Sequence, residues 1–177
     1  MGNSLATSAP PTPGSSSAGA PRILLLEDSP GEAELFCQAL ALAWARCEPG
    51  AKSLRPGVDV QYTGQDALEG VKRQVALQGR NLPDLIVLDL DLPGGASLKF
   101  LRELRNDFRL ASLPVVVMAW SDEQPSMRTL YGLGMVGYFV KPLHFSDLLT
   151  MVRNICQTWL PKNRRQEICL LDKERNT

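Results

Sequence analysis

The sequence predicts an α/β fold built on one open, parallel sheet. Short apolar runs alternate with longer segments in which apolar residues recur every three or four positions, as in strands separated by helices. Such alternation within one domain produces a parallel sheet with helices on both faces. The chain of 177 residues is long enough for one such domain and leaves little for a second.

Five apolar runs are the predicted strands. The first follows Arg22 and stops at Glu27, the third stops at Asp89, and the fifth stops at Lys141. Proline at position 114 precedes the fourth run, where it marks the start of a strand. The predicted strands are residues 23–26, 58–62, 85–88, 115–119 and 138–140.

Helices are predicted between these strands from apolar residues at helical spacing. The first opens at Ser29-Pro30-Gly31-Glu32, the pattern of a capping box with proline at the first helical position. A weaker helix covers residues 124–133, and the last begins near Ser146. Five such βα units fit a flavodoxin-like doubly wound sheet. The apolar positions of the four stronger helices are Phe36, Ala39, Leu40 and Ala43; Ala67, Leu68, Val71 and Val75; Leu98, Leu101 and Leu104; and Leu148, Leu149, Val152, Ile155 and Trp159.

The ends of the chain differ from its middle. Residues 1–20 are rich in Ser, Pro, Ala and Gly and predict a disordered tail; residues 161–177 are a predicted tail or arm, which leaves 21–160 as the domain. Basic and acidic residues both number 19, so overall charge favours neither nucleic acid nor a membrane surface. No apolar run approaches the roughly 20 residues that span a bilayer. Without a secretory signal, and with four scattered cysteines, we expect a cytoplasmic protein with reduced thiols.

Charged residues end three of the predicted strands. These residues are Glu27 and Asp28, then Asp89, then Lys141. Because the carboxyl ends of parallel strands meet in one crevice, we expect the four side chains to lie together. Neighbouring carboxylates repel one another unless a cation lies among them, and hard oxygen ligands suit Mg²⁺. Any one of these acids alone could be a solvated loop residue, but the set can hold a divalent cation and a phosphoryl group.

This set of residues, in this chain order, resembles the receiver domain of two-component response regulators. The resemblance covers residues 22–160 and implies the strand order 2-1-3-4-5. It implies that Asp89 is the phosphoacceptor, whose carboxylate attacks the phosphorus of a phosphohistidine. Lys141 would pair with Asp89 at rest and with a phosphoryl oxygen after transfer. The resemblance also makes the Lys141–Pro142 bond a candidate for the cis form.

The same resemblance implies a set of Mg²⁺ ligands. Asp28 and Asp89 would bind the metal directly, Glu27 would act largely through water, and the backbone carbonyl of Asp91 would complete the protein ligands.

The sequence departs from the receiver pattern near the end of the fourth strand. The family has serine or threonine where this chain has Ala119, so the threonine-and-tyrosine switch lacks its first hydroxyl. Trp120 follows at a position that is usually small, where it could restrict access to the site. Tyr138 retains the aromatic switch position, and Ser121 is an alternative donor if the loop shifts. Ser97 replaces a common glycine, and Gly94-Gly95 are placed to supply the lost flexibility.

Two segments are most similar to phytochrome-associated single-domain regulators: residues 27–36 and Thr158-Trp159-Leu160. This similarity implies a sensor histidine kinase as partner, a phytochrome among the candidates, with output through protein–protein contacts and without enzymatic turnover. It also implies a homodimer, for which Trp159 and Leu160 would lie exposed beyond the sheet edge. The alternative is that Trp159 folds back on its own domain.

Two other functions fit parts of the same pattern. A pseudo-receiver would bind partners without a phosphorylation-driven switch, and Ala119 and Trp120 favour it. The Asp89-Leu90-Asp91 sequence also resembles the DxD motif of haloacid-dehalogenase phosphatases, in which the second aspartate is a general acid. That family carries the motif on its first strand and needs a later acidic pair, which this chain lacks after Lys141.

Overall fold

The structure is a computed structural model that describes residues 20–47, 56–77, 82–121 and 127–160. The predicted tails, residues 1–20 and 161–177, lie outside these ranges except for residue 20. The first residues of the helix predicted over 124–133 lie outside them as well. None of the helices in the described part of the chain is long and apolar enough to cross a membrane.

Five parallel strands form one sheet in the order β2-β1-β3-β4-β5, which confirms the predicted fold class and strand order. β5 begins at Met135 rather than at residue 138, because the exposed Val136 and the small Gly137 interrupt its apolar run. The strands are β1 (Arg22–Leu26), β2 (Gly57–Gln61), β3 (Leu85–Asp89), β4 (Val115–Ala119) and β5 (Met135–Val140).

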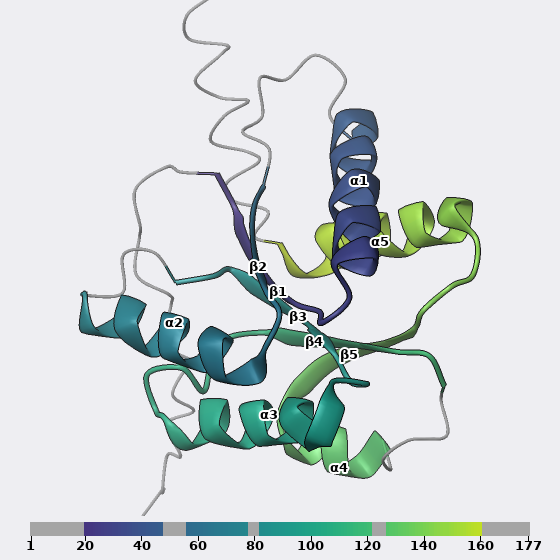
Figure 1. Cartoon of the computed structure of the whole chain (residues 1–177). Helices are drawn as coiled ribbons and strands as arrows, with labels where there is room; N and C mark the ends of the chain where they lie inside the picture. Colours follow the sequence, from purple (N-terminus) through teal and green to yellow (C-terminus); the bar gives the residue numbers. More distant parts are fainter. Residues whose placement is uncertain (1–19, 48–55, 78–81, 122–126, 161–177) are drawn as a thin grey trace, which may run out of the picture.

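Helices cover both faces of the sheet (Figure 1). α1 (Pro30–Cys47) and α5 (Phe145–Trp159) pack on one face. α2 (Gly64–Ala76), α3 (Ala96–Asn106) and α4 (Met127–Gly132) pack on the other. A short 3₁₀ helix, η1 (Pro93–Gly95), precedes α3. β3 and β4 are buried along their whole length, as expected of central strands covered on both faces.

The start of α1 forms only half of the predicted capping box. The Ser29 hydroxyl accepts a hydrogen bond from the Glu32 backbone N–H at 3.4 Å, as predicted. The Glu32 carboxylate does not return to the Ser29 N–H, which donates instead to the Glu27 carboxylate at 3.1 Å. Glu32 binds the Lys141 ammonium at 2.6 Å. A charged donor is a stronger partner than a backbone amide, which explains the difference.

The expectation that Trp159 and Leu160 lie exposed beyond the sheet is wrong. Leu160 is 2% exposed, and the Trp159 ring packs edge-to-face on Phe139 with ring centroids 5.8 Å apart. A β-carbon built on Gly137 would lie 2.6 Å from a ring carbon of Trp159. The indole therefore fills the space that the missing side chain leaves, and the end of α5 folds back on its own domain.

Candidate functional site

β1, β3 and β5 bring the predicted site residues to one edge of the sheet. Glu27 and Asp28 directly follow β1, Asp89 is the last residue of β3, and Lys141 directly follows β5. Glu27, Asp89 and Lys141 are buried, whereas Asp28 is exposed. One carboxylate oxygen from each of Glu27, Asp28 and Asp89 lies within 4.8 Å of the other two. A solvated loop position therefore does not describe the two buried acids.

The Lys141 ammonium lies at the centre of this cluster. It contacts Asp89 at 3.0 Å, Glu27 at 2.8 Å and Glu32 at 2.6 Å. The Lys141 backbone N–H donates to the Ala119 carbonyl at 2.7 Å, which ties the residue to the end of β4. The predicted pairing of Lys141 with Asp89 is present, but the contact with Glu32 was not predicted. The capping-box pattern predicts instead that the Glu32 carboxylate accepts from the Ser29 backbone N–H.

Burial and charge act in opposite directions on the pKa values of these groups. Burial raises the pKa of the Glu27 carboxyl, although hydrogen bonding to Lys141 opposes the change. Burial likewise raises the pKa of Asp89. The Asp91 backbone N–H, 3.0 Å from the Asp89 carboxylate, and the Lys141 ammonium both act to lower it, but burial is the larger effect. Burial alone would lower the pKa of Lys141, but its hydrogen bonds to Glu27 and Glu32 and the nearby negative charges hold that pKa above its ordinary value.

The residues present fit a small divalent cation. The carboxylates of Glu27, Glu32 and Asp89 contact a single ammonium, and that of Asp28 lies close to those of Glu27 and Asp89, so acidic groups outnumber the one basic group. The raised pKa values of the two buried acids show that one ammonium does not fully compensate their burial. Closely spaced oxygen ligands of this kind are those that Mg²⁺ prefers.

Asp91 connects two loops of the site. Its backbone N–H donates to the Asp89 carboxylate at 3.0 Å, and its own carboxylate accepts from the Trp120 backbone N–H at 2.8 Å. The side chain is thus engaged with the loop after β4. That the Asp91 backbone carbonyl binds a metal stays a prediction.

Ser97 and two glycines shape the loop after Asp89. The buried Ser97 hydroxyl lies 2.6 Å from the carbonyl oxygen of Asp89 and 3.1 Å from that of Leu90. A glycine at position 97 could not hold the loop in this way. Gly94 and Gly95 have φ values of 65° and 69°, which side-chain-bearing residues rarely adopt. The two glycines therefore adopt backbone conformations that only their expected flexibility readily allows.

The switch positions differ from a hydroxyl-based arrangement, as the sequence indicates. Ala119 is buried at the end of β4 and offers no side-chain donor. The half-exposed Trp120 ring lies over Lys141, with its centroid 5.5 Å from the ammonium nitrogen, a cation–π contact. The Tyr138 hydroxyl donates to the Ser121 carbonyl, which fixes the loop after β4 to β5.

The described peptide bonds are all trans, so the expectation of a cis Lys141–Pro142 bond is wrong for this structure. Trans is the lower-energy form of an X-Pro bond.

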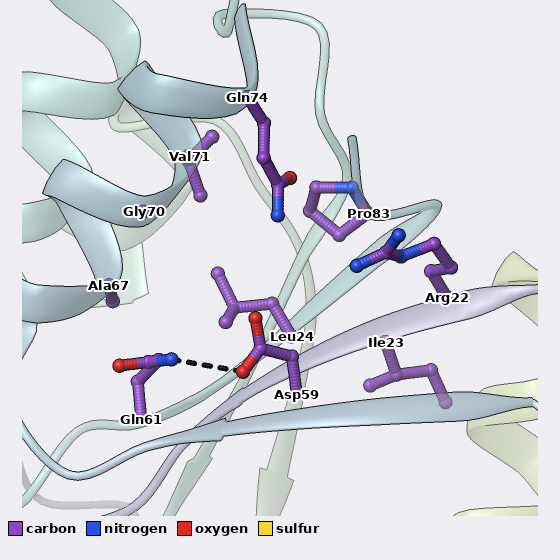
Figure 2. A pocket seen from close by; sticks show the side chains of 10 residues that line it. All are labelled: Arg22, Ile23, Leu24, Asp59, Gln61, Ala67, Gly70, Val71, Gln74 and Pro83. Carbon is purple, nitrogen blue, oxygen red and sulfur yellow. Dashed lines mark hydrogen bonds between the residues drawn. The ribbon is translucent and has the colours of Figure 1, made fainter. Parts of the chain in front are cut away.

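Two pockets near the sheet are too small to hold a small-molecule ligand. A pocket of about 60 Å³ lies beside Lys141, walled by Phe36, Trp120 and Met151, and is far below the roughly 300 Å³ of small-molecule sites. A second, of about 20 Å³, lies between β1, β2 and α2 (Figure 2), where Gln61 donates to Asp59 at 2.9 Å. It has room for about one water and is lined by none of the predicted site residues.

Comparison with known families identifies the chain. Residues 50–153 match the response regulator receiver domain. The chain belongs to this family. The matched segment includes Asp89 and Lys141 and begins after Glu27 and Asp28, which the fold brings to the same sheet edge.

Curated relatives of this receiver domain include proteins of different sizes. The chain is 37% identical over 86 residues to the probable methanogenesis regulatory protein FilR2 of Methanothrix harundinacea, a match that covers 49% of this chain and 56% of FilR2. It is 28% identical over 138 residues to response regulator Rcp1 of Synechocystis, covering 78% of this chain and 88% of Rcp1. The chain thus spans about half the length of FilR2 but most of Rcp1.

Solved structures point to the same group of receivers. The phosphorylated cyanobacterial phytochrome response regulator RcpA superposes with a TM-score of 0.68 at 27% identity, covering 81% of this chain and 96% of RcpA. The Mn²⁺-bound form of Rcp1 superposes with a TM-score of 0.63 at 27% identity, covering 79% and 94%. The receiver domain described here is therefore close to phytochrome response regulators.

Proposed function

We propose that this receiver domain acts as a single-domain response regulator that accepts a phosphoryl group on Asp89 from a sensor histidine kinase. The observation that carries the proposal is the position of Asp89, buried at the end of β3 with Lys141 at 3.0 Å and the Glu27 and Asp28 carboxylates beside it. Family membership favours this function over a DxD phosphatase.

The residues of the site account for the transfer step. An oxygen of the Asp89 carboxylate attacks phosphorus, a new P–O bond forms, and the P–N bond of the phosphohistidine breaks with its electron pair left on the imidazole. Lys141 is placed to follow the charge, because its ammonium already lies 3.0 Å from Asp89 and can bind a phosphoryl oxygen. Mg²⁺, held by Asp28, Asp89, the backbone carbonyl of Asp91 and, through water, Glu27, would neutralise charge on the phosphoryl oxygens.

Intact-protein mass spectrometry after incubation with acetyl phosphate and Mg²⁺ tests the phosphoacceptor. We expect one phosphoryl adduct on the wild type and none on Asp89→Asn. Asp91→Asn is the matched control, because it alters the next carboxylate of the same loop and leaves Asp89 in place. An adduct that persists in Asp89→Asn but is lost in Asp91→Asn would reject Asp89 as the acceptor.

A titration of Mg²⁺ tests the ligand assignment separately. Asp28→Asn and Asp89→Asn should weaken binding strongly, whereas Asp91→Ala should retain it, because only the main-chain carbonyl of Asp91 is assigned to the metal. Loss of binding in Asp91→Ala together with normal binding in Asp28→Asn would show that the ligands are assigned wrongly.

A pseudo-receiver is a second candidate function, and the buried Ala119 favours it. The missing hydroxyl removes a hydrogen bond to the phosphoryl group, worth about 0.5–1.5 kcal/mol or more to a charged acceptor, while leaving the transfer residues intact. Phosphorylation should therefore occur with a muted conformational response. Amide exchange with and without a phosphoryl mimic separates the two functions: a large change from β4 to α5 would reject the pseudo-receiver.

The proposed partners follow from the relatives. RcpA is a phytochrome response regulator, so we include a phytochrome among the candidate sensor kinases. We also propose a cytoplasmic location and a homodimer, and no nucleic-acid or membrane partner. Phosphotransfer profiling against the histidine kinases of the source organism would identify the donor.

A further inference from the structure

The Lys141 ammonium has no donor left for a new acceptor. An ammonium carries three N–H donors, and the three carboxylates that contact Lys141 belong to Glu27, Glu32 and Asp89. Before transfer, while Asp89 is still a carboxylate, a phosphoryl oxygen that binds Lys141 must therefore replace one of these three acids; after transfer, the donor that bound the Asp89 carboxylate is free for it.

The three acids differ in how readily they can leave. The side chains of Glu27 and Asp89 are both 3% exposed, whereas that of Glu32 is 34% exposed. A buried carboxylate that loses its cation pays a large desolvation cost, but Glu32 can turn into water from the first turn of α1. Glu27 is held further by the Ser29 backbone N–H at 3.1 Å.

Building on the function proposed above, we propose that Glu32 is a positioning residue that competes with the phosphoryl group for Lys141. At rest it occupies the third donor of the ammonium, at 2.6 Å. When the phosphoryl group reaches Asp89, the Glu32 carboxylate leaves and a phosphoryl oxygen takes its place. Glu32 thus slows phosphorylation by holding the lysine in a resting contact.

Three variants of α1 separate this role from general effects of charge. Glu32→Gln keeps the size of the side chain and removes its charge. Glu32→Asp keeps the charge but shortens the side chain, which breaks the contact with Lys141. Glu34→Gln is the matched control, because Glu34 is exposed on the same helix and binds Gln38 at 3.1 Å rather than Lys141.

The first measurement needs no phosphorylation. The ammonium protons of Lys141 in ¹⁵N-labelled protein, without divalent cations, should exchange slowly with water in the wild type and in Glu34→Gln. They should exchange faster in both Glu32 variants, where one donor is released. Exchange that is the same in all four proteins would overturn the proposal whether or not Asp89 is ever phosphorylated.

The second measurement is the rate of phosphorylation by acetyl phosphate, in which an O–P bond breaks, acetate leaves and Asp89 gains the phosphoryl group. We expect both Glu32 variants to react about two- to five-fold faster than wild type, the range of a partly exposed ion pair, and Glu34→Gln to be unchanged. The gain should shrink at high salt, since exposed charges are screened.

The outcomes distinguish the two proposals. A wild type that never gains a phosphoryl group rejects the proposed function, and the ammonium exchange still tests the Glu32 contact. A phosphorylated wild type with unchanged or slower Glu32 variants overturns competition by Glu32 and leaves the proposed function standing. Acceleration in Glu32→Gln but not in Glu32→Asp would show that the charge at position 32 matters and that its contact with Lys141 does not. This result would also overturn the proposed competition.

Discussion

Lys141 contacts three acids of the site, so we expect the stability of the fold to depend on it. Without divalent cations, Lys141→Met should lower the free energy of unfolding by about 3–5 kcal/mol, because Glu27 and Asp89 would remain buried without a cation. The control Lys72→Met removes an exposed ion pair to Glu103 at 3.4 Å and should cost at most about 1 kcal/mol. Urea unfolding measures both variants. Equal losses would argue against a special role for the buried lysine.

Whereas loss of the Lys141 charge should destabilise the fold, loss of the Asp89 charge should stabilise it. Its pKa is raised above the ordinary 3.8, so the folded chain binds this proton more tightly than the unfolded chain. The associated stability is fully present below pH 3.8 and is lost as the pH rises through the raised pKa. Asp89→Asn removes this loss and leaves Lys141 paired with Glu27 and Glu32.

We therefore expect Asp89→Asn to raise the Tm near neutral pH without divalent cations, and the gain to shrink as the pH falls toward 3.8. Thermal unfolding across a pH series measures it, with the exposed Asp59→Asn as control. A variant less stable than wild type near neutral pH would contradict this prediction.

The positions of Asp89 and Lys141 at strand ends could be predicted from the sequence, because a strand that ends in a charge points that charge at a known edge of the sheet. Glu32 could not be found in this way. Its local pattern predicts a cap, and only the tertiary approach of β5 to α1 supplies the lysine that it binds instead.

At the scale of elements, Arg105 joins α3 to two turns on the same side of the sheet. Its guanidinium donates to the carbonyl oxygens of Ala111 and Leu113 before β4, and to those of Leu133 and Gly134 before β5. These bonds run between 2.8 and 2.9 Å. One side chain thus fixes the turns that lead into two neighbouring strands.

Arg105→Met should cost about 2–3 kcal/mol of stability and increase amide exchange in the turn between α4 and β5. Arg109→Met is the control, since the exposed Arg109 side chain makes its hydrogen bonds to Asp107, and it should cost at most about 1 kcal/mol. Unfolding in urea and amide exchange check the two parts. Unchanged exchange in the turn would show that other contacts hold it.

Regular elements were easier to predict than their last residues. β4 is predicted to the residue, because proline precedes an uninterrupted apolar run. The end of α5 is the clearest difference: the sequence places Trp159 at helical spacing but does not show that Gly137, on β5, leaves room for its ring. This contact depends on the tertiary packing of α5 against β5, which the local sequence pattern does not reveal.

At the scale of the whole molecule, β5 is an edge strand, and both β5 and α4 carry exposed large hydrophobic residues. Val136 and Val140 on β5 and Tyr131 on α4 are exposed. An apolar sheet edge is a favourable surface for a second copy of the chain. A truncation after Gln157 would be an unsuitable test of this dimer, because it would also remove Leu160, which is buried in the core of its own domain.

We expect the wild type to form a dimer at micromolar concentration and Val136→Lys to weaken it. Leu77→Lys is the control, because Leu77 is an exposed leucine at the end of α2, away from this edge. Light scattering measures all three. A monomeric wild type would reject the homodimer, and equal dissociation in both variants would reject this surface.

The position of Trp120 over Lys141 has a practical consequence. The chain has three tryptophans, and of these Trp44 is buried against the sheet and Trp159 packs on Phe139. Only Trp120 is seen to lie over an ammonium, at 5.5 Å. Indole emission shifts when a nearby charge moves, so replacing Trp44 and Trp159 with phenylalanine would leave a single fluorophore beside Lys141. The protein thus contains an intrinsic optical probe, with which events at Asp89 can be followed in real time without an attached dye.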